Sequence, residues 1–294
     1  MTRRFGKEEA ETTRYAVISD IHGNYKALEA FLQYLEKHPA DGVICLGDYV
    51  TDAPYPERLM ELLCRMQETH VCYMIRGNRE DYLLNNRDNR QGWKPSSANG
   101  MLYYTLCGLR REDLDFFEKL ATERDLRAEG CPPLYLCHGT PGNIRGNMLE
   151  DPRLREEVLE SMPRPYLLGG HSHRQETAHR GGNTYINPGS LGLAIDGVGG
   201  RARFAVITGD RRGWRPELLS LPYDTESYLR DFAASGLEEI GMTLCKAVKK
   251  TLVTGINYFF RCIQEMEREA AGAGVGLADM PEEVWKRLEE RFAL

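Results

Sequence analysis

The sequence predicts an α/β protein that carries a helical segment at its C-terminal end. Short β-rich runs at residues 15–19, 42–47 and 71–75 are each followed by a loop and an amphipathic helical pattern. Repeated strand–helix units of this kind favour a largely parallel sheet that is buried on both faces. Residues 223–294 show helical spacing without a clear strand. A chain of 294 residues can hold one large α/β domain with such an addition.

The remaining elements follow from local composition. Residues 86–111 combine Pro, Ser and Gly and are expected to be irregular, and 112–120 fit a helix. Strands are expected within 132–139 and 164–173, each leading into a histidine, and the strand pieces after them alternate with Gly-rich turns that suggest antiparallel pairing. We therefore expect three parts: a flexible tail over 1–14, the α/β domain over 15–222 and the helical element over 223–294.

Charge and composition exclude several classes of protein. The chain has 38 Lys and Arg against 44 Asp and Glu, a net charge of −6, which disfavours long nucleic acid and anionic membranes as partners. No apolar run reaches the roughly 18 residues of a membrane span, and the polar start lacks the apolar stretch of a secretion signal. We expect a cytoplasmic protein. The eight cysteines include no C-x-x-C pair, which argues against a disulfide framework or a zinc ribbon.

A series of polar side chains follows the predicted strands directly. Ligand sites in α/β proteins gather at the carboxyl ends of strands, so we expect these side chains to converge. The Asp-x-His and His-x-His pairs place a second candidate at i+2, which points to the same side in extended backbone. The candidate ligands are Asp20, His22, Asp48, Asn78, His138, His171 and His173.

Two carboxylates, one amide and four imidazoles are more ligands than one metal ion takes from a protein. We expect two ions about 3.5–4 Å apart that share one carboxylate, as in two-metal hydrolases. Nitrogen and oxygen ligands without thiolate favour divalent or trivalent Mn or Fe, and Zn also fits. Any one of these residues could equally be an ordinary hydrogen-bonded loop residue. Their common position after strands favours metal binding.

The motifs resemble those of the calcineurin-like metallophosphoesterases in order and spacing, over about residues 15–222. They are Asp20-Ile21-His22, Gly47-Asp48, Gly77-Asn78, His138-Gly139 and Gly170-His171-Ser172-His173. The resemblance implies a four-layer sandwich, in which two central mixed sheets carry helices on both outer faces. It implies that one ion is held by Asp20, His22, Asp48 and His173. It also implies that the second is held by Asp48, as the bridge, with Asn78, His138 and His171.

The activity that this resemblance implies is hydrolysis of phosphoric esters by a hydroxide that bridges the two ions. Residues 46–60 and the helical tail look closer to small bacterial phosphodiesterases and asymmetric dinucleoside tetraphosphate hydrolases than to large eukaryotic protein phosphatases. The expected substrate is a small phosphodiester, nucleotide or phosphoanhydride. Catalytic roles are assigned to Asp48, Asn78, Arg79 and His138.

One motif departs from the family pattern. The histidine that usually follows Gly77-Asn78, and that is assigned to protonation of the leaving group, is replaced by Arg79. Without that acid, substrates with good leaving groups are favoured. Arg79 at a helix start fits either a phosphate clamp or a surface salt bridge. Asn24 is placed with Arg79 among the substrate-binding candidates.

Other interpretations stay open at this point. A metallo-β-lactamase-like hydrolase needs an early His-x-His-x-Asp-His cluster, whereas this chain has Asp-x-His early and His-x-His late. A binding or scaffold protein with weak catalysis fits the missing histidine. The 223–294 element fits either a cap over the site or a homo-oligomer interface. Its Tyr258, Phe259 and Phe260 fit a stacking lid or, as the amphipathic pattern favours, a helix packed on the core.

Overall fold

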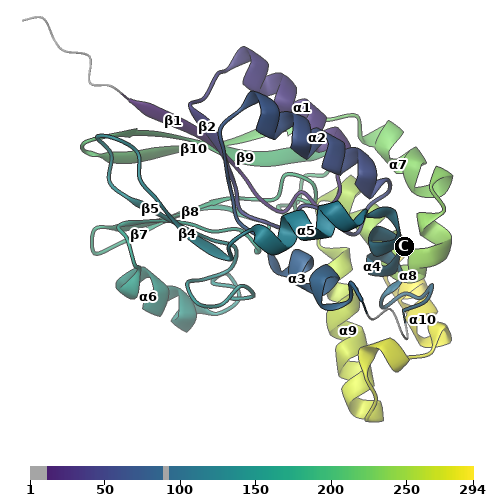
Figure 1. Ribbon diagram of the computed structural model, residues 1–294. Helices are drawn as coiled ribbons and strands as arrows, with labels where there is room; N and C mark the ends of the chain where they lie inside the picture. Colours follow the sequence, from purple (N-terminus) through teal and green to yellow (C-terminus); the bar gives the residue numbers. More distant parts are fainter. Residues whose placement is uncertain (1–11, 89–92) are drawn as a thin grey trace, which may run out of the picture.

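The computed structural model describes residues 12–88 and 93–294, in which two five-stranded mixed sheets pack face to face (Figure 1). In the first sheet, the three strands nearest the N-terminus are parallel and the two late strands add antiparallel to one edge. Its order is β10 (Gly213–Pro222), β9 (Arg201–Asp210), β1 (Thr13–Ile18), β2 (Gly42–Cys45) and β3 (Cys72–Met74).

The second sheet has a parallel centre and an antiparallel strand on each edge. Its order is β4 (Glu123–Leu126), β5 (Leu134–Cys137), β6 (Tyr166–Leu168), β8 (Asn183–Pro188) and β7 (Gln175–Arg180). The antiparallel pairing predicted for the late strands is therefore confirmed for β9 with β10, and both sheets are mixed.

Helices cover both outer faces of the pair of sheets. The described helices are α1 (Tyr25–Lys37), α2 (Pro56–Thr69), α3 (Asn78–Asn85), α4 (Gly100–Gly108), α5 (Arg111–Lys119), α6 (Pro152–Ser161), α7 (Thr225–Ala234), α8 (Leu237–Thr254), α9 (Tyr258–Ala273), the short 3₁₀ turn η1 (Leu277–Asp279) and α10 (Glu282–Phe292). Helix α6 packs on the second sheet through Val158 and Leu159. The predicted four-layer sandwich is confirmed.

Strand β1 shows why its run is apolar at every position. Tyr15 and Val17 lie in the core between the two sheets, whereas Ala16 and Ile18 lie in the core between the first sheet and the helices. Successive side chains of a strand point to opposite faces, so a strand covered on both sides needs apolar residues throughout.

The C-terminal helices belong to the same hydrophobic core as the helices of the first half. Phe232, Leu244 and Trp285 are buried in one cluster with residues of α1, α2 and the first sheet. Figure 1 shows α8, α9 and α10 together beside α3 and α4. The segment after Pro222 therefore packs directly against the sandwich.

Several local expectations were wrong. Strand β1 begins at Thr13, inside the predicted tail, of which residues 1–11 lie outside the described part of the chain. Helix α4 lies within the segment expected to be irregular; it has almost no polar face because it packs between α2 and α8. Helix α6 and the polar edge strands β4 and β7 were not predicted either. Edge strands often carry polar residues, which hides their strand pattern.

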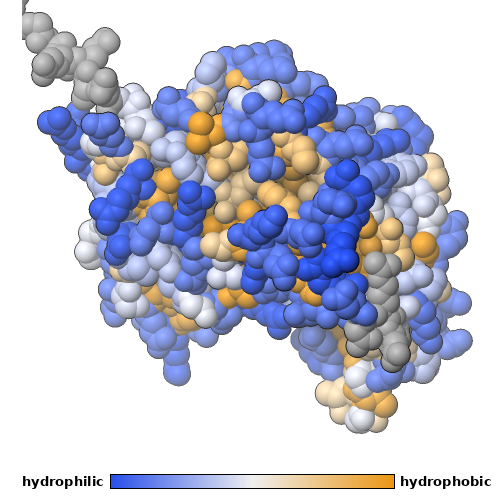
Figure 2. Space-filling model, viewed as in Figure 1, coloured by the Kyte–Doolittle hydropathy of each residue, from blue (hydrophilic) through white to orange (hydrophobic). Residues whose placement is uncertain are grey.

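None of the described helices is long and apolar enough to cross a membrane. The face of the molecule drawn in Figure 2 is mostly hydrophilic, with small hydrophobic areas between the polar side chains.

Candidate metal centre

The structure brings all seven predicted ligands together where the carboxyl ends of the parallel strands meet. The first sheet supplies the residues after β1, β2 and β3, and the second sheet supplies those after β5 and β6. Within this set, two groups could each hold a metal ion: Asp20, His22 and His173, and Asp48, His138 and His171. The ligand atoms of each group lie within 4.8 Å of one another.

The backbone at these positions is unusual. Five of the seven candidates have positive φ, a conformation that residues other than glycine rarely adopt: Asp20 (53°), His22 (45°), Asp48 (55°), His171 (63°) and His173 (57°). The extended backbone predicted at the Asp-x-His and His-x-His pairs is therefore wrong. Bonds such as that from the His22 N–H to the Asp48 carbonyl, 3.0 Å, hold these turns in place. Such strained turns cluster at functional sites, where surrounding structure enforces them.

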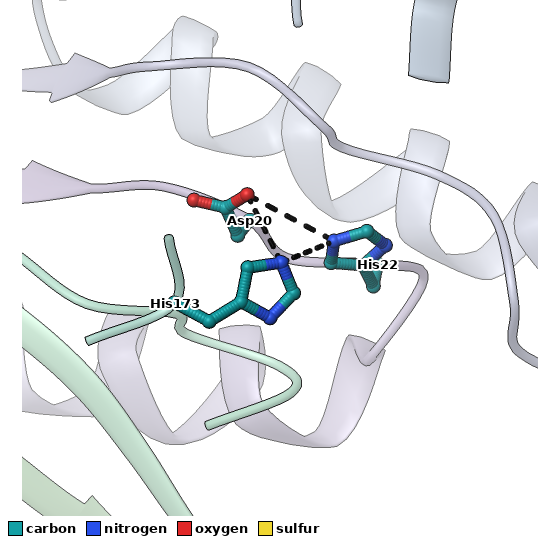
Figure 3. Close-up of side chains that lie close together, drawn as sticks. All are labelled: Asp20, His22 and His173. Atoms are coloured by element: carbon teal, nitrogen blue, oxygen red, sulfur yellow. Dashed lines mark hydrogen bonds and ion pairs between the residues drawn. The ribbon is translucent and has the colours of Figure 1, made fainter. Parts of the chain in front are cut away.

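Figure 3 shows the first group, in which one carboxylate faces two imidazoles. The Nε2 atoms of His22 and His173 are 3.0 Å apart. The Oδ1 atom of Asp20 lies 3.3 Å from Nε2 of His173 and 3.9 Å from Nε2 of His22. Asp20 is fully buried, and its Oδ1 has no hydrogen-bond partner among the described residues.

This group fits a cation. Nδ1 of His173 donates to the Leu193 carbonyl at 2.8 Å, and Nδ1 of His22 lies 3.1 Å from a carboxylate oxygen of Asp52. With the Nδ1 proton of each ring engaged in this way, the Nε2 lone pairs of the neutral rings would face each other and the Asp20 oxygen. Lone pairs this close repel unless a positive charge lies between them. A metal ion supplies that charge, and its ligands here would be two nitrogens and one oxygen.

The second group has the same construction. Nδ1 of His138 donates to the Leu46 carbonyl at 2.7 Å, which directs Nε2 toward Oδ1 of Asn78 at 3.2 Å and Oδ2 of Asp48 at 3.4 Å. The same Asp48 oxygen lies 3.8 Å from Nε2 of His22 in the first group. Asp48 therefore stands between the two groups.

The electrostatics of this region favour bound positive charge. Burial opposes ionisation of Asp20 and Asp48, but the surrounding histidines outweigh it and hold the pKa of both carboxyl groups well below the usual range. Burial lowers the pKa of His138, yet Asp48 and Asp20 raise that pKa to about 10. Burial and the neighbouring His138 lower the pKa of His171 to about 4. The two carboxylates thus favour a positive charge beside His138, which a bound metal ion would supply.

Glu80 holds the backbone next to this centre, a role that its sequence pattern did not predict. Its carboxylate is fully buried and accepts hydrogen bonds from the N–H groups of Gly77 (2.8 Å), Asp48 (2.9 Å) and Tyr49 (2.8 Å). Gly77 lets Asp48 lie close to the start of α3, since a Cβ added at Gly77 would lie 2.2 Å from Oδ1 of Asp48. An acidic residue three positions after the N-cap residue Gly77 was the available signal.

We expect Glu80→Gln to lower the free energy of unfolding by about 1–3 kcal/mol. The amide oxygen of Gln can still accept hydrogen bonds, but the amide NH₂ must face one of the three buried N–H groups, and that donor is left without a partner. Urea unfolding of the chelator-treated protein measures the change. A variant as stable as the wild type would show that these three bonds contribute nothing.

Asp52 and Arg79 form a buried ion pair next to the first group. The Arg79 side chain is 13% exposed, and its Nη2 lies 2.9 Å from Oδ2 of Asp52. That oxygen also accepts from Thr51 Oγ1 at 2.9 Å and from Nδ1 of His22 at 3.1 Å. Arg79 is therefore not an exposed salt-bridge residue, and its role as a phosphate clamp stays a prediction. Asp52 was not predicted because nothing in its local pattern shows that His22 lies beside it.

Asn24 has a structural position. It is buried at the start of α1, where its side-chain oxygen accepts from the Ala27 N–H at 3.0 Å and its amide donates to the Gly192 carbonyl at 2.9 Å. Both of its polar groups make hydrogen bonds within the fold, and its role in substrate binding stays a prediction.

Comparison with known protein families agrees with this geometry. The model of the calcineurin-like phosphoesterase superfamily domain matches residues 14–211. The chain belongs to this superfamily. It is thus a metallophosphoesterase, and the predicted enzyme class, a metal-dependent phosphoric ester hydrolase, is confirmed. Membership also implies divalent metal ions, for which the two ligand groups are candidates.

Relatives of this phosphoesterase cover most of the chain at low identity. The uncharacterized protein MJ0912 of Methanocaldococcus jannaschii is 24% identical over 239 residues, which cover 76% of this chain and 93% of that protein. The hypothetical protein PH1004 of Pyrococcus horikoshii OT3 superposes with a TM-score of 0.69 at 21% identity, covering 83% of this chain and 98% of that one. A metallophosphoesterase of Sphaerobacter thermophilus gives a TM-score of 0.64 at 21% identity, covering 83% and 100%. These two structures share the fold.

Proposed function

We propose that this phosphoesterase uses two metal ions to hydrolyse small phosphodiesters, nucleotides or phosphoanhydrides. The position of Asp48 Oδ2, 3.4 Å from Nε2 of His138 and 3.8 Å from Nε2 of His22, is the observation that carries the proposal. In this assignment Asp48 is shared, Asp20, His22 and His173 complete the first site, and Asn78, His138 and His171 complete the second. Mixed nitrogen and oxygen ligands favour Mn or Fe, and Zn also fits.

The ligand set supports a phosphate substrate in an acidic protein. Two divalent ions would bring a charge of about +4 against the two carboxylates Asp20 and Asp48, which leaves about +2 at the metal centre. Asn78 adds an oxygen ligand without cancelling further charge. When bound, such a pair of ions activates water as a nucleophile and neutralises the phosphoryl oxygens. The chain's net charge of −6 disfavours long polyanions, so a short phosphate ester is the better fit.

Arg79 restricts the choice of leaving group. Burial lowers its pKa, but Asp52 and Asp48 outweigh burial and raise the pKa above that of a free arginine. A guanidinium of this kind does not release a proton at neutral pH, so it cannot protonate a departing oxygen. We therefore propose that the substrates carry leaving groups that depart without protonation from this position, such as aryl phosphates and phosphoanhydrides.

A series of phosphodiesters with graded leaving groups tests this proposal on the Mn²⁺-loaded full chain. We expect bis-p-nitrophenyl phosphate to be hydrolysed at least about 100-fold faster than diesters with alkyl leaving groups, since Arg79 cannot protonate the poorer groups as they depart. Equal rates across the series would contradict the role given to Arg79. Two bound ions without turnover on any member would favour a binding or scaffold protein instead.

A further inference from the structure

The turn between α8 and α9 contacts helix α3 and one loop of the metal centre. It comprises residues 252–259 and lies outside the segment 14–211 that the superfamily model matches. Helix α8 ends at Thr254, Gly255 follows with φ of 69°, and α9 begins at Tyr258. In Figure 1, α9 runs beside α3, the helix that begins with Asn78 and Arg79.

One route leads from this turn to His22. The Phe259 side chain is buried, and its ring centroid lies 5.4 Å from the guanidinium carbon of Arg79, a cation–π distance. The guanidinium pairs with Oδ2 of Asp52 at 2.9 Å, and the same oxygen lies 3.1 Å from Nδ1 of His22. The ring therefore helps to fix the cation, the cation fixes the carboxylate, and the carboxylate fixes the imidazole.

A second route leads to His173. The carbonyls of Leu252 and Gly255 accept hydrogen bonds from Gly200 N–H and Gly197 N–H, each at 2.9 Å. These glycines end the loop that begins at Leu191, and Leu193 of that loop accepts the Nδ1 proton of His173 at 2.8 Å. Contact at the turn is close, because a Cβ added at Gly255 would lie 2.3 Å from the Val198 nitrogen.

We infer that the α8–α9 turn positions His22 and His173 and so sets the affinity of one of the two metal sites, that of Asp20, His22 and His173. This inference rests on the proposed two-ion function. The second site has other supports: the Leu46 carbonyl holds Nδ1 of His138, and Glu80 holds the backbone N–H of Asp48. Phe259 and Gly255 are thus positioning residues for the first site alone.

Two pairs of variants isolate this effect. Phe259→Leu removes the ring next to Arg79, and Phe260→Leu is its control because Phe260 is the next residue on the same helix and is 37% exposed.

The second pair changes the turn itself. Gly255→Ala adds a methyl group that is expected to displace the loop at Val198. Its control is Gly274→Ala, since Gly274 ends α9 with φ of 70° and an added Cβ there meets no atom within 4 Å. Alanine at position 274 therefore has a similar energetic cost from its positive φ, but its Cβ contacts no neighbouring loop.

Titration of the chelator-treated full chain with Mn²⁺ in a calorimeter measures both sites without an activity assay. We expect two ions to bind the wild type and both controls. In Phe259→Leu and Gly255→Ala, the affinity for one ion is expected to fall about 10–100-fold, the usual effect of losing an outer partner of a metal ligand, with the other ion unaffected. Phe259→Tyr keeps the ring and is expected to keep the wild-type affinity.

The other possible results distinguish the role of the α8–α9 turn from the proposed two-ion function. Wild-type affinities at both sites in Phe259→Leu would overturn the inference and leave the proposed function intact. Equal weakening of both sites would also overturn it, since that result indicates a general loss of structure. Failure of the wild type to bind a second ion would overturn the proposed function together with the inference. If Gly255→Ala does not fold, as judged by circular dichroism, Phe259→Leu decides alone.

Discussion

Asp48→Asn is expected to lower phosphoester turnover at least about 1,000-fold while the protein keeps its fold. The asparagine retains an oxygen that can accept the Arg79 N–H, which lies 2.8 Å from Oδ1 of Asp48. It loses the negative charge on Oδ2, the atom that we place between both ions. A 1,000-fold loss in rate corresponds to about 4 kcal/mol of transition-state stabilisation. A loss of this size is expected if the binding of both metal ions is weakened at once.

Hydrolysis of bis-p-nitrophenyl phosphate under saturating Mn²⁺ measures this loss. Asp151→Asn is the matched control: Asp151 caps α6 on the outer face of the second sheet, and asparagine caps helices equally well. The control is expected to keep wild-type turnover and wild-type stability. Full activity in Asp48→Asn would remove the shared carboxylate from the mechanism.

Asp52→Ala is expected to lower the free energy of unfolding by about 3–5 kcal/mol, the cost of leaving one member of a buried ion pair without its partner. Asp52 is 2% exposed, so its removal leaves the Arg79 charge and the Nδ1 proton of His22 without their acceptor in a region that solvent barely reaches. Chemical denaturation in the presence of chelator gives the value without a contribution from bound metal.

The double variant Asp52→Leu with Arg79→Met separates the contribution of the buried charges to stability from the contribution of side-chain packing. Apolar residues of similar size often replace a buried ion pair at little cost, so we expect this variant to recover most of the lost stability. It does not recover the hydrogen bond to His22, and its Mn²⁺ affinity is expected to stay low. A loss below about 1 kcal/mol in Asp52→Ala would show that Arg79 finds other partners or water.

The sequence predicted the seven candidate ligands because their signal is local. Each follows a short apolar strand, as Asp48 follows β2 and His138 follows β5, and strand ends of α/β sheets meet at one edge. Asp52 and Glu80 carry no such signal. Asp52 is important because the fold places it against His22, which is 30 positions away in the sequence. Glu80 is important because its carboxylate accepts a hydrogen bond from the backbone N–H of Asp48.

In the C-terminal segment too, the local sequence pattern does not predict contacts with distant residues. Its amphipathic pattern correctly favoured a packed helix, and Phe259 is buried. Periodicity gives the face of a helix that is covered but not the residue that covers it, so the contact with Arg79 could not be predicted. The positive φ values at Asp20 and His22 were also beyond sequence rules, because surrounding bonds impose them against local preference.

Activity of the chelator-treated chain as Mn²⁺ is added back tests the two-ion account most directly. We predict that hydrolysis of bis-p-nitrophenyl phosphate is absent after chelation and returns only as the second equivalent of metal binds. Activity that survives chelation, or that reaches its maximum with one ion bound per chain, would contradict the account.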